Sequence, residues 1–306
     1  MKVLIVCSAN SGKVAPFIVE QVDSLASLGV ESEYFLVQQK GILGYLKLRK
    51  ALIQKIISYQ PDIIHAHYGL SGLLANLQRK IPVVTTYLGS DINYAKVFFF
   101  SKIAMLLSAH NIFVSEKNRV KSNLRKTDSL VPFGVITELF VPLDQTEART
   151  VLKLDIRKKY VLFAGNFLNP VKNFTLAQAA VELLSEVELM SLGKGYTREE
   201  VVQLMNAVDV ALMTSYSEGS PQFIKEVMAC NCPIVSVDVG DVAEITDGVD
   251  GCYISSYDAK DAASKIQMAL DFGKRTDGRK RIVELKLDII SIANKIFDIY
   301  KMVLKS

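Results

Sequence analysis

The residues with the clearest chemical potential lie between positions 215 and 235, where an apolar strand gives way to a helix. Glu218 precedes a turn that contains Gly219 and Ser220, and Glu226 lies about two helical turns further on, on the same face. Unpaired backbone N–H groups at a helix start favour a phosphate or an anionic sugar oxygen. The two carboxylates could hold hydroxyl groups at two ends of one polar ligand. Taken alone, however, two glutamates on one helix face are more often solvated surface residues.

The elements that position these residues are predicted by the spacing of apolar residues. Runs rich in Val and Ile alternate with longer segments of helical spacing, which is typical of β-α-β units in a parallel sheet. In the first half these runs lie at residues 3–7, 63–67, 83–87 and 112–115. The pattern restarts with strands at 160–165, 208–214 and 233–237 and with helices near 173–185, 197–207 and 222–230. We therefore expect an α/β fold with two doubly wound domains, the second smaller.

The limits of these domains follow from turn-forming and polar residues between positions 131 and 147, which indicate a linker. We predict an N-terminal domain at residues 1–145 and a C-terminal domain at residues 146–282. Apolar residues at helical spacing continue from 283 to 304. The segment 283–306 is therefore predicted to form one or two amphipathic helices that pack across both domains.

Composition excludes several classes of protein. No stretch of the 306 residues reaches the roughly 20 uncharged positions that span a bilayer, and the N-terminus lacks a signal-peptide pattern, so we expect a cytoplasmic protein. The net charge of +4 is far from that of a dedicated nucleic-acid binder. The four cysteines are few for this length, and no second Cys or His pair completes a zinc site. All four are interpreted as reduced. A Rossmann dehydrogenase is disfavoured, since no Gly-x-Gly-x-x-Gly follows the first strand.

The region around the two glutamates resembles a known signature. Glu218, seven residues, Glu226 and then Ala-Cys-x-x-Pro-Ile-Val is similar to the donor motif of the retaining family 4 glycosyltransferases. The resemblance implies the GT-B fold, in which two Rossmann-like domains face each other across a cleft. It also implies that Glu218 contacts the transferred sugar and that Glu226 binds the nucleotide ribose. The turn that contacts sugar and phosphate would consist of Gly219, Ser220, Pro221 and Gln222.

A second segment resembles the diphosphate-binding part of the same family. Residues 163–167 and then Lys172 are similar to the strand-end glycine, arginine and later lysine of that family, with Gly165 as the glycine and Asn166 in place of the arginine. Departure of a nucleoside diphosphate places negative charge on the β-phosphate, so a fixed cation is the help that this chemistry needs most. The resemblance assigns this role to Lys172, which without that context would be a solvated loop residue.

The first half carries three further matches. His65 and His67 resemble the strand-end His-x-His of the family, which implies that His67 faces the sugar across the cleft and that His65 is structural. A buried, hydrogen-bonded histidine is the alternative for His67, and a metal pair is disfavoured because no third ligand is visible. Gly12 resembles the glycine loop near phosphate and acceptor. Asp91 resembles a residue that meets the acceptor, although it could equally cap a helix, and Leu88 replaces a polar residue of that segment.

The implied function is transfer of a sugar from a nucleotide sugar, UDP- or GDP-linked, to a saccharide or lipid-linked acceptor in cell-surface polysaccharide or glycolipid synthesis. The resemblance implies retention of configuration, no metal and no cofactor besides the substrate, with Lys172, Glu218 and His67 as the catalytic group. An epimerase or a phosphorylase of the same fold is the rival enzyme. The rival of another class is a donor-binding or assembly subunit without turnover, which Asn166, Leu88 and a shortened second domain favour.

Two segments of the first half suggest a surface for membranes. Residues 41–60 combine basic residues with leucines, and residues 96–107 contain three consecutive phenylalanines. A basic amphipathic helix beside exposed aromatic residues would let the protein lie on anionic lipid, at the inner face of the membrane. Core packing is the alternative for 98–107. The basic run at 116–126 lacks the interleaved aromatic residues of a nucleic-acid site, so no nucleic-acid partner is expected.

Overall fold

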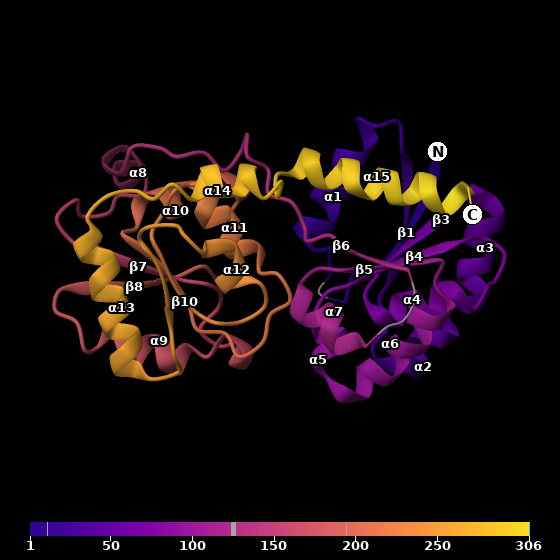
Figure 1. Cartoon of the computed structure of the whole chain (residues 1–306), viewed down its shortest axis with the longest axis horizontal. Coiled ribbons are helices and arrows are strands. Elements are labelled where there is room, and N and C mark those ends of the chain that lie inside the picture. The colour runs from indigo at the N-terminus through magenta and orange to yellow at the C-terminus, as the bar shows by residue number, and fades with distance from the viewer. Residues whose placement is uncertain (11, 124–126, 194, 306) are drawn as a thin grey trace. The chain divides into compact units, whose positions relative to one another are not determined.

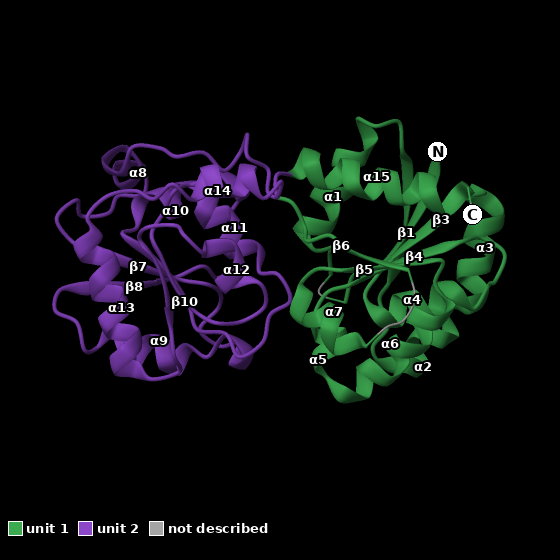
Figure 2. Ribbon diagram, in the orientation of Figure 1, with its two compact units in different colours: residues 1–134, 289–306 green, residues 135–288 purple. Residues whose placement is uncertain are grey.

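The computed structural model describes residues 1–10, 12–123, 127–193 and 195–305. The chain forms two compact units, residues 1–134 with 289–306 and residues 135–288 (Figure 2). The chain therefore leaves the first unit after Gly134 and returns to it at Ile289, whereas the sequence placed these two points near residue 145 and at residue 283.

The first unit is built on a six-stranded parallel sheet with the order β2-β1-β3-β4-β5-β6. Its central strands are the continuous apolar runs that the sequence predicted, because a strand covered on both faces has no polar side. The edge strands β2 and β6 were not predicted, since β2 is rich in polar residues and β6 is very short. The strands are β1 (Lys2–Ser8), β2 (Glu31–Val37), β3 (Ile63–His67), β4 (Val83–Tyr87), β5 (His110–Phe113) and β6 (Asp128–Leu130).

Helices cover both faces of this sheet. On one face, Ile18 of α1 and Tyr300 of α15 pack on Ile5 of β1 in one apolar cluster, and α15 runs alongside α1 (Figure 1). On the other face, Leu4 of β1 packs with Leu52 of α3 and with α4. The helices of this unit are α1 (Pro16–Ala26), α2 (Gly41–Lys47), α3 (Arg49–Tyr59), α4 (Gly69–Asn76), α5 (Ser90–Asn93), α6 (Ala95–Leu107), α7 (Glu116–Ser122) and α15 (Ile289–Lys305).

The second unit contains a five-stranded parallel sheet with the order β11-β10-β9-β7-β8. The doubly wound architecture that was predicted for both halves is confirmed. The strands are β7 (Lys159–Phe163), β8 (Val187–Ser191), β9 (Val210–Met213), β10 (Ile234–Val237) and β11 (Cys252–Ser255). The helices are α8 (Gln145–Val151), the 3-10 turn η1 (Pro170–Lys172), α9 (Phe174–Val181), α10 (Arg198–Ala207), α11 (Gln222–Ala229), α12 (Val242–Thr246), α13 (Ala259–Phe272) and α14 (Gly278–Glu284).

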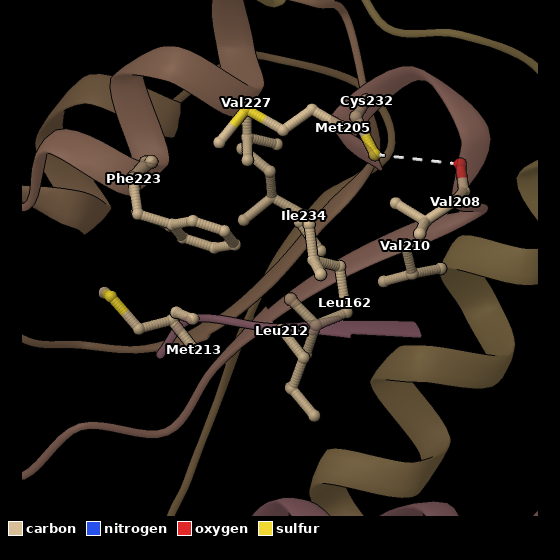
Figure 3. Packing of buried hydrophobic residues seen from close by; sticks show 14 of the residues in the cluster. Leu162, Met205, Val208, Val210, Leu212, Met213, Phe223, Val227, Cys232 and Ile234 are labelled. Atoms are coloured by element: carbon tan, nitrogen blue, oxygen red, sulfur yellow. Dashed lines mark hydrogen bonds between the residues drawn. The ribbon is translucent and has the colours of Figure 1, made fainter. Parts of the chain in front are cut away.

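The core of the second unit fixes the helix that carries the predicted signature. Leu162, Leu212 and Ile234 come from three adjoining strands, and Phe223 and Val227 of α11 pack with them (Figure 3). These side chains are largely or fully withdrawn from solvent. Because α11 is anchored in this way, the turn before it is held at the carboxyl edge of the sheet, which is where open α/β sheets bind ligands.

The segment between Asn173 and Val201 is short, as the sequence indicated, and its described residues form α9 and β8 before α10 begins. The start of α10 is defined by a capping box, in which the Thr197 hydroxyl accepts from the backbone of Glu200 and the Glu200 carboxylate accepts from Thr197 N. Arg198 is therefore the first residue of that helix.

Candidate active site

Two loops at the carboxyl edge of the second sheet are tied together. The backbone N–H of Tyr216, after β9, donates to the carbonyl of Val171 in η1, after β7, over 2.9 Å. The hydroxyl of Thr214 donates to the carbonyl of Lys172, also over 2.9 Å. Because β7 and β9 are neighbours, these bonds bring the lysine and the glutamate of the predicted signature to one place.

Lys172 and Glu218 form an ion pair there. The Lys172 ammonium donates to Oε1 of Glu218 over 2.7 Å, and the two side chains are 24% and 18% exposed. Gly165 lies directly beneath the lysine: a Cβ at this position would lie 3.2 Å from Cγ of Lys172, and the φ of +147° suits glycine. The structure thus brings Gly165, Lys172 and Glu218 together, as a partly buried charge pair that remains open to a ligand.

The turn before α11 has a fixed shape and free donors. Among the described residues, nothing accepts a hydrogen bond from the backbone N–H groups of Gly219 and Ser220. Gly240, with a φ of +59°, lies behind the turn, and a Cβ there would come within 2.5 Å of the carbonyl oxygen of Gly219. Pro221 then caps α11, which begins at Gln222. Unpaired N–H groups next to a helix start are the arrangement that binds phosphate oxygens.

Glu226 lies inside α11 and has a cationic partner. Nη2 of Arg198 donates to Oε1 of Glu226 over 2.7 Å, and the glutamate side chain is only 6% exposed. The Arg198 guanidinium also lies 4.7 Å from the ring centroid of Phe140. Sequence reasoning did not single out Arg198, although the Thr-x-x-Glu capping box would have marked it as the first residue of a helix after a strand.

Asn166 stands where the family pattern has an arginine, and it supplies no positive charge. Its side-chain oxygen accepts from the backbone N–H of Leu168 over 2.8 Å, and its carbonyl accepts from Asn169 N. The residue therefore shapes its own loop. Arg198 is the second cation that the structure brings to a predicted site glutamate in this unit.

In the first unit, the two histidines of β3 have different surroundings. The His65 ring bonds to the Tyr300 hydroxyl at 2.6 Å and to the Thr86 hydroxyl at 2.8 Å, so its predicted structural role is confirmed. His67 is 1% exposed, and neither ring nitrogen has a hydrogen-bond partner in the described part of the chain. Burial lowers the pKa of His67 to about 3. It is therefore a neutral imidazole, and its contact with a sugar stays a prediction.

Asp91 is used by the backbone of its own unit. Its two oxygens accept from the N–H groups of Gly69, Leu88 and Gly89, each at 2.9 Å, and the side chain is fully buried. Burial raises the pKa of this carboxyl to about 6. Of the two interpretations of Asp91, the geometry supports the backbone-binding one, and contact with an acceptor stays a prediction.

Gly12 lies in the exposed loop after β1, with a φ of +94° that favours glycine. Its N–H donates to the carbonyl of Ala9 over 3.0 Å, which closes the turn. In the residues that the structure describes, no group of three or more His, Cys, Asp or Glu side chains is arranged to hold a metal ion.

Two family models match the chain on either side of its middle. The model of glycosyl transferase 4-like proteins matches residues 2–130, and the model of glycosyl transferases group 1 matches residues 190–271. Together they account for well over half of the chain. The chain belongs to the family 4 glycosyltransferases. The family resemblance that the sequence motifs suggested is thereby confirmed.

Individual relatives of this glycosyltransferase are distant. The putative teichuronic acid biosynthesis glycosyltransferase TuaC of Bacillus subtilis is 23% identical over 215 residues, which are 60% of this chain and 55% of the relative. The chain spans 55 to 62% of the length of the first curated relatives that it matches.

Solved structures confirm the GT-B fold. Sucrose-phosphate synthase from Thermosynechococcus elongatus superposes with a TM-score of 0.85 at 18% identity, over 100% of both chains. Anabaena HepE in complex with UDP-glucose superposes with a TM-score of 0.79 at 17% identity, over 99% of this chain and 100% of that one. At these identities the likeness is one of fold.

Proposed function

We propose that this protein is a retaining glycosyltransferase that transfers a sugar from a UDP- or GDP-linked donor to a saccharide or lipid-linked acceptor. The observation that carries the proposal is the Lys172–Glu218 pair, 2.7 Å apart, next to the backbone N–H groups of Gly219 and Ser220, which have no acceptor among the described residues. The likeness to TuaC, a putative teichuronic acid biosynthesis glycosyltransferase, supports a polysaccharide pathway. The UDP-glucose bound to HepE supports a nucleotide-sugar donor.

In the proposed reaction the bond between the anomeric carbon and the β-phosphate oxygen breaks, and the diphosphate leaves with the bonding electrons. The ammonium of Lys172 and the N–H groups of the turn stabilise the charge that develops on that oxygen. Because these groups supply the positive partners, we propose a transfer that does not depend on a metal. The oxygen of the acceptor hydroxyl bonds to the anomeric carbon on the face that the diphosphate leaves, and its proton passes to the departing diphosphate, which gives retention without a protein nucleophile.

The remaining groups would hold the donor. Glu218 would accept hydrogen bonds from hydroxyls of the transferred sugar once the donor separates it from Lys172. Glu226 would accept from the ribose, with Arg198 orienting its carboxylate. Gly165 and Asn166 would form the loop beside the diphosphate.

A lipid surface is proposed as a partner of the first unit. Leu43 of α2 and Phe99 and Leu106 of α6 are 72%, 64% and 68% exposed, and α2 and α6 pack on the same helix, α4. Exposed basic residues accompany them on these helices, namely Lys47, Lys96 and Lys102. Leu52 and Met105, in contrast, are core residues. Apolar side chains among cations suit an anionic bilayer, so we propose peripheral association at its cytoplasmic face.

Sedimentation with vesicles tests this surface. No helix within the described residues has both the length and the apolar character to cross a bilayer. Binding to vesicles that contain phosphatidylglycerol should exceed binding to pure phosphatidylcholine, and Phe99→Ser with Leu106→Ser should abolish the difference. Leu183→Ser, at a 56% exposed leucine of the second unit, is the matched control. Equal binding to both kinds of vesicle contradicts the proposal.

One observation favours a second candidate, a donor-binding or assembly subunit without turnover. Asn166 stands where the family pattern has a cation, and its side chain is engaged in its own loop. Loss of one positive partner would slow departure of the diphosphate more than it would weaken binding of the donor.

A binding experiment with a turnover assay separates these candidates. Calorimetry with a panel of UDP- and GDP-sugars should find one donor that binds at micromolar concentration, and Lys172→Ala and Glu226→Ala should weaken it. Lys158→Ala, which removes an exposed ion pair with Glu188, is the control. Release of free nucleotide in the presence of an acceptor supports the transferase, and binding without release supports the subunit. If no donor binds to the wild-type protein, both the transferase and the donor-binding subunit are refuted.

A further inference from the structure

The helix that carries Glu226 contains a buried lysine that the proposed reaction does not use. Lys225 is fully withdrawn from solvent, and its ammonium donates to the Ser220 hydroxyl over 3.1 Å. The Ser220 hydroxyl in turn donates to Oδ2 of Asp241 over 2.5 Å. We call Lys225, Ser220 and Asp241 the turn network. It joins α11 to the residue that precedes α12, behind the turn before α11.

Stability alone does not explain this network. Burial lowers the pKa of Lys225 to about 8, against the opposing influence of Asp241 and Glu226, and it raises the pKa of Asp241. Both shifts mean that the charged forms are disfavoured in the fold. Oδ1 of Asp241 is also buried without a hydrogen-bond partner among the described residues. Apolar side chains of similar size commonly give a fold that is as stable as a buried pair or more so.

The network constrains the residues whose N–H groups are free. The single proton of the Ser220 hydroxyl is donated to Asp241, and an oxygen lone pair accepts from Lys225, so the side chain is fixed on both sides. Gly240, next to Asp241, leaves no room for a side chain against Gly219, since a Cβ there would lie 2.5 Å from the Gly219 carbonyl oxygen. The peptide groups of Gly219 and Ser220 are thus held from behind, while their N–H groups have no acceptor in the described residues.

We infer that Lys225 and Asp241 are positioning residues for the diphosphate of the donor. Through Ser220 they hold the backbone N–H groups of the turn in the orientation that binds the β-phosphate, without touching the ligand themselves. The inference rests on the proposed function, which supplies the diphosphate. It gives the buried charges a task that packing does not require.

The test compares ligands with and without a β-phosphate. UDP and UMP, or GDP and GMP if the donor panel selects guanosine, are titrated into wild type, Ser220→Ala and the double variant Lys225→Met/Asp241→Asn. The double variant removes both charges and so leaves no unpaired one. We expect the diphosphate to bind about tenfold more weakly to each variant, since the turn loses one or two hydrogen bonds that orient it. Binding of the monophosphate should change by no more than about twofold.

Ser236→Ala is the control, because Ser236 is a fully buried serine of β10 whose hydroxyl donates to the carbonyl of Val237 and, among the described residues, bonds to no group of the turn network. Its diphosphate affinity should equal that of wild type. The inference is overturned if the variants melt at the wild-type temperature and bind UDP and UMP with wild-type affinity. Equal weakening of both nucleotides also overturns it, since that indicates general disorder of the unit. Absence of binding to wild type refutes the proposed function itself and the inference with it.

Discussion

The two units share one architecture and differ in how they treat the polar groups at the carboxyl edge of the sheet. In the second unit, charges from separate segments are paired with one another, as in Lys172 with Glu218 and Arg198 of α10 with Glu226 of α11. In the first unit, His65 and Asp91 are bonded inward to their own fold. The same kind of sheet thus carries ion pairs at this edge in one unit and buried polar side chains bonded to their own fold in the other.

This difference matches the chemistry that each edge could serve. A departing diphosphate needs fixed cations and oriented N–H groups, and a site that already holds them requires little reorganisation when charge develops. His67 is the exception in the first unit, because it is buried with no partner for either ring nitrogen in the described part of the chain. Its pKa of about 3 makes it a neutral hydrogen-bonding group at physiological pH.

The largest effect is expected at the charge pair of the second unit. Lys172→Ala should lower the turnover number about 100- to 1,000-fold, since removal of one preorganised positive partner of a developing anion typically has this effect. Steady-state release of nucleotide measures it. Lys158→Ala, at an exposed pair in the same unit, should retain wild-type turnover. A Lys172→Ala enzyme with more than a tenth of wild-type turnover would show that another group stabilises the leaving diphosphate.

The two histidines of β3 give the next largest effect and separate function from stability. His65→Phe should lower the free energy of unfolding by about 2 to 4 kcal/mol, because it leaves the buried Tyr300 and Thr86 hydroxyls unpaired. His67→Phe removes no hydrogen bond to a described residue and keeps an aromatic ring beside Phe133, so the cost should stay below about 1.5 kcal/mol.

For turnover we expect the opposite order, with a larger loss in His67→Phe than in His65→Phe. His67→Phe should lower it at least about tenfold, because the predicted contact with the sugar is lost. Denaturant unfolding and nucleotide release, measured on the same two variants, check both statements. Full activity of His67→Phe would mean that the edge of the first unit supplies no catalytic group at this position.

Most of the fold could be predicted from the sequence, because strands buried on both faces leave continuous apolar runs. The strands at β1, β3 and β4 are examples. The prediction failed for β2, whose glutamates and serine at an edge do not form such a run, and for β8, which lies in the segment that the sequence left unassigned. In both strands, partial exposure at the sheet edge removes the apolar signal.

The site could be predicted only as far as the motifs reach. The motifs and their order along the chain identified Lys172, Glu218 and Glu226 as site residues, and the structure places the first two in contact. Arg198 was missed because its partner lies 28 residues away on another helix. Lys225 was missed because a lysine in a short helix is normally expected at the surface, whereas α11 is enclosed by the sheet and by α14.

A smaller effect is expected from Arg198, which tests whether pairing in the second unit serves the donor. Arg198→Ala should weaken binding of the donor about tenfold, because Glu226 loses the cation that orients its carboxylate. The donor affinity of Arg198→Lys should lie between those of wild type and Arg198→Ala, since an ammonium restores the charge but not the planar contact with Phe140. Calorimetry measures both, with Arg157→Ala at an exposed pair as the control. Unchanged affinity would assign the pair to stability alone.

The smallest effect concerns Asp91 and extends the comparison to pH. The pKa of this carboxyl is raised to about 6 in the fold, so the folded state binds its proton more tightly than the unfolded chain does. The contribution to stability is therefore greatest at low pH and is lost as the pH rises through about 6. From pH 7.5 to pH 5.5, wild type should gain about 1 kcal/mol relative to Asp91→Asn, which does not titrate.

The comparison of wild type with Asp91→Asn cancels the contribution of the histidines, which both proteins share. Because the pKa values of His65 and His67 are lowered in the fold, these residues reduce the stability of both proteins as the pH falls. Urea unfolding of both proteins at the two pH values measures the difference between them, and any constant cost of the asparagine also cancels. A difference that does not change with pH would show that the three backbone N–H groups around Asp91 offset its burial. In that case Asp91 would be a fully compensated charge like those of the second unit, and the contrast between the two edges would rest on His67 alone.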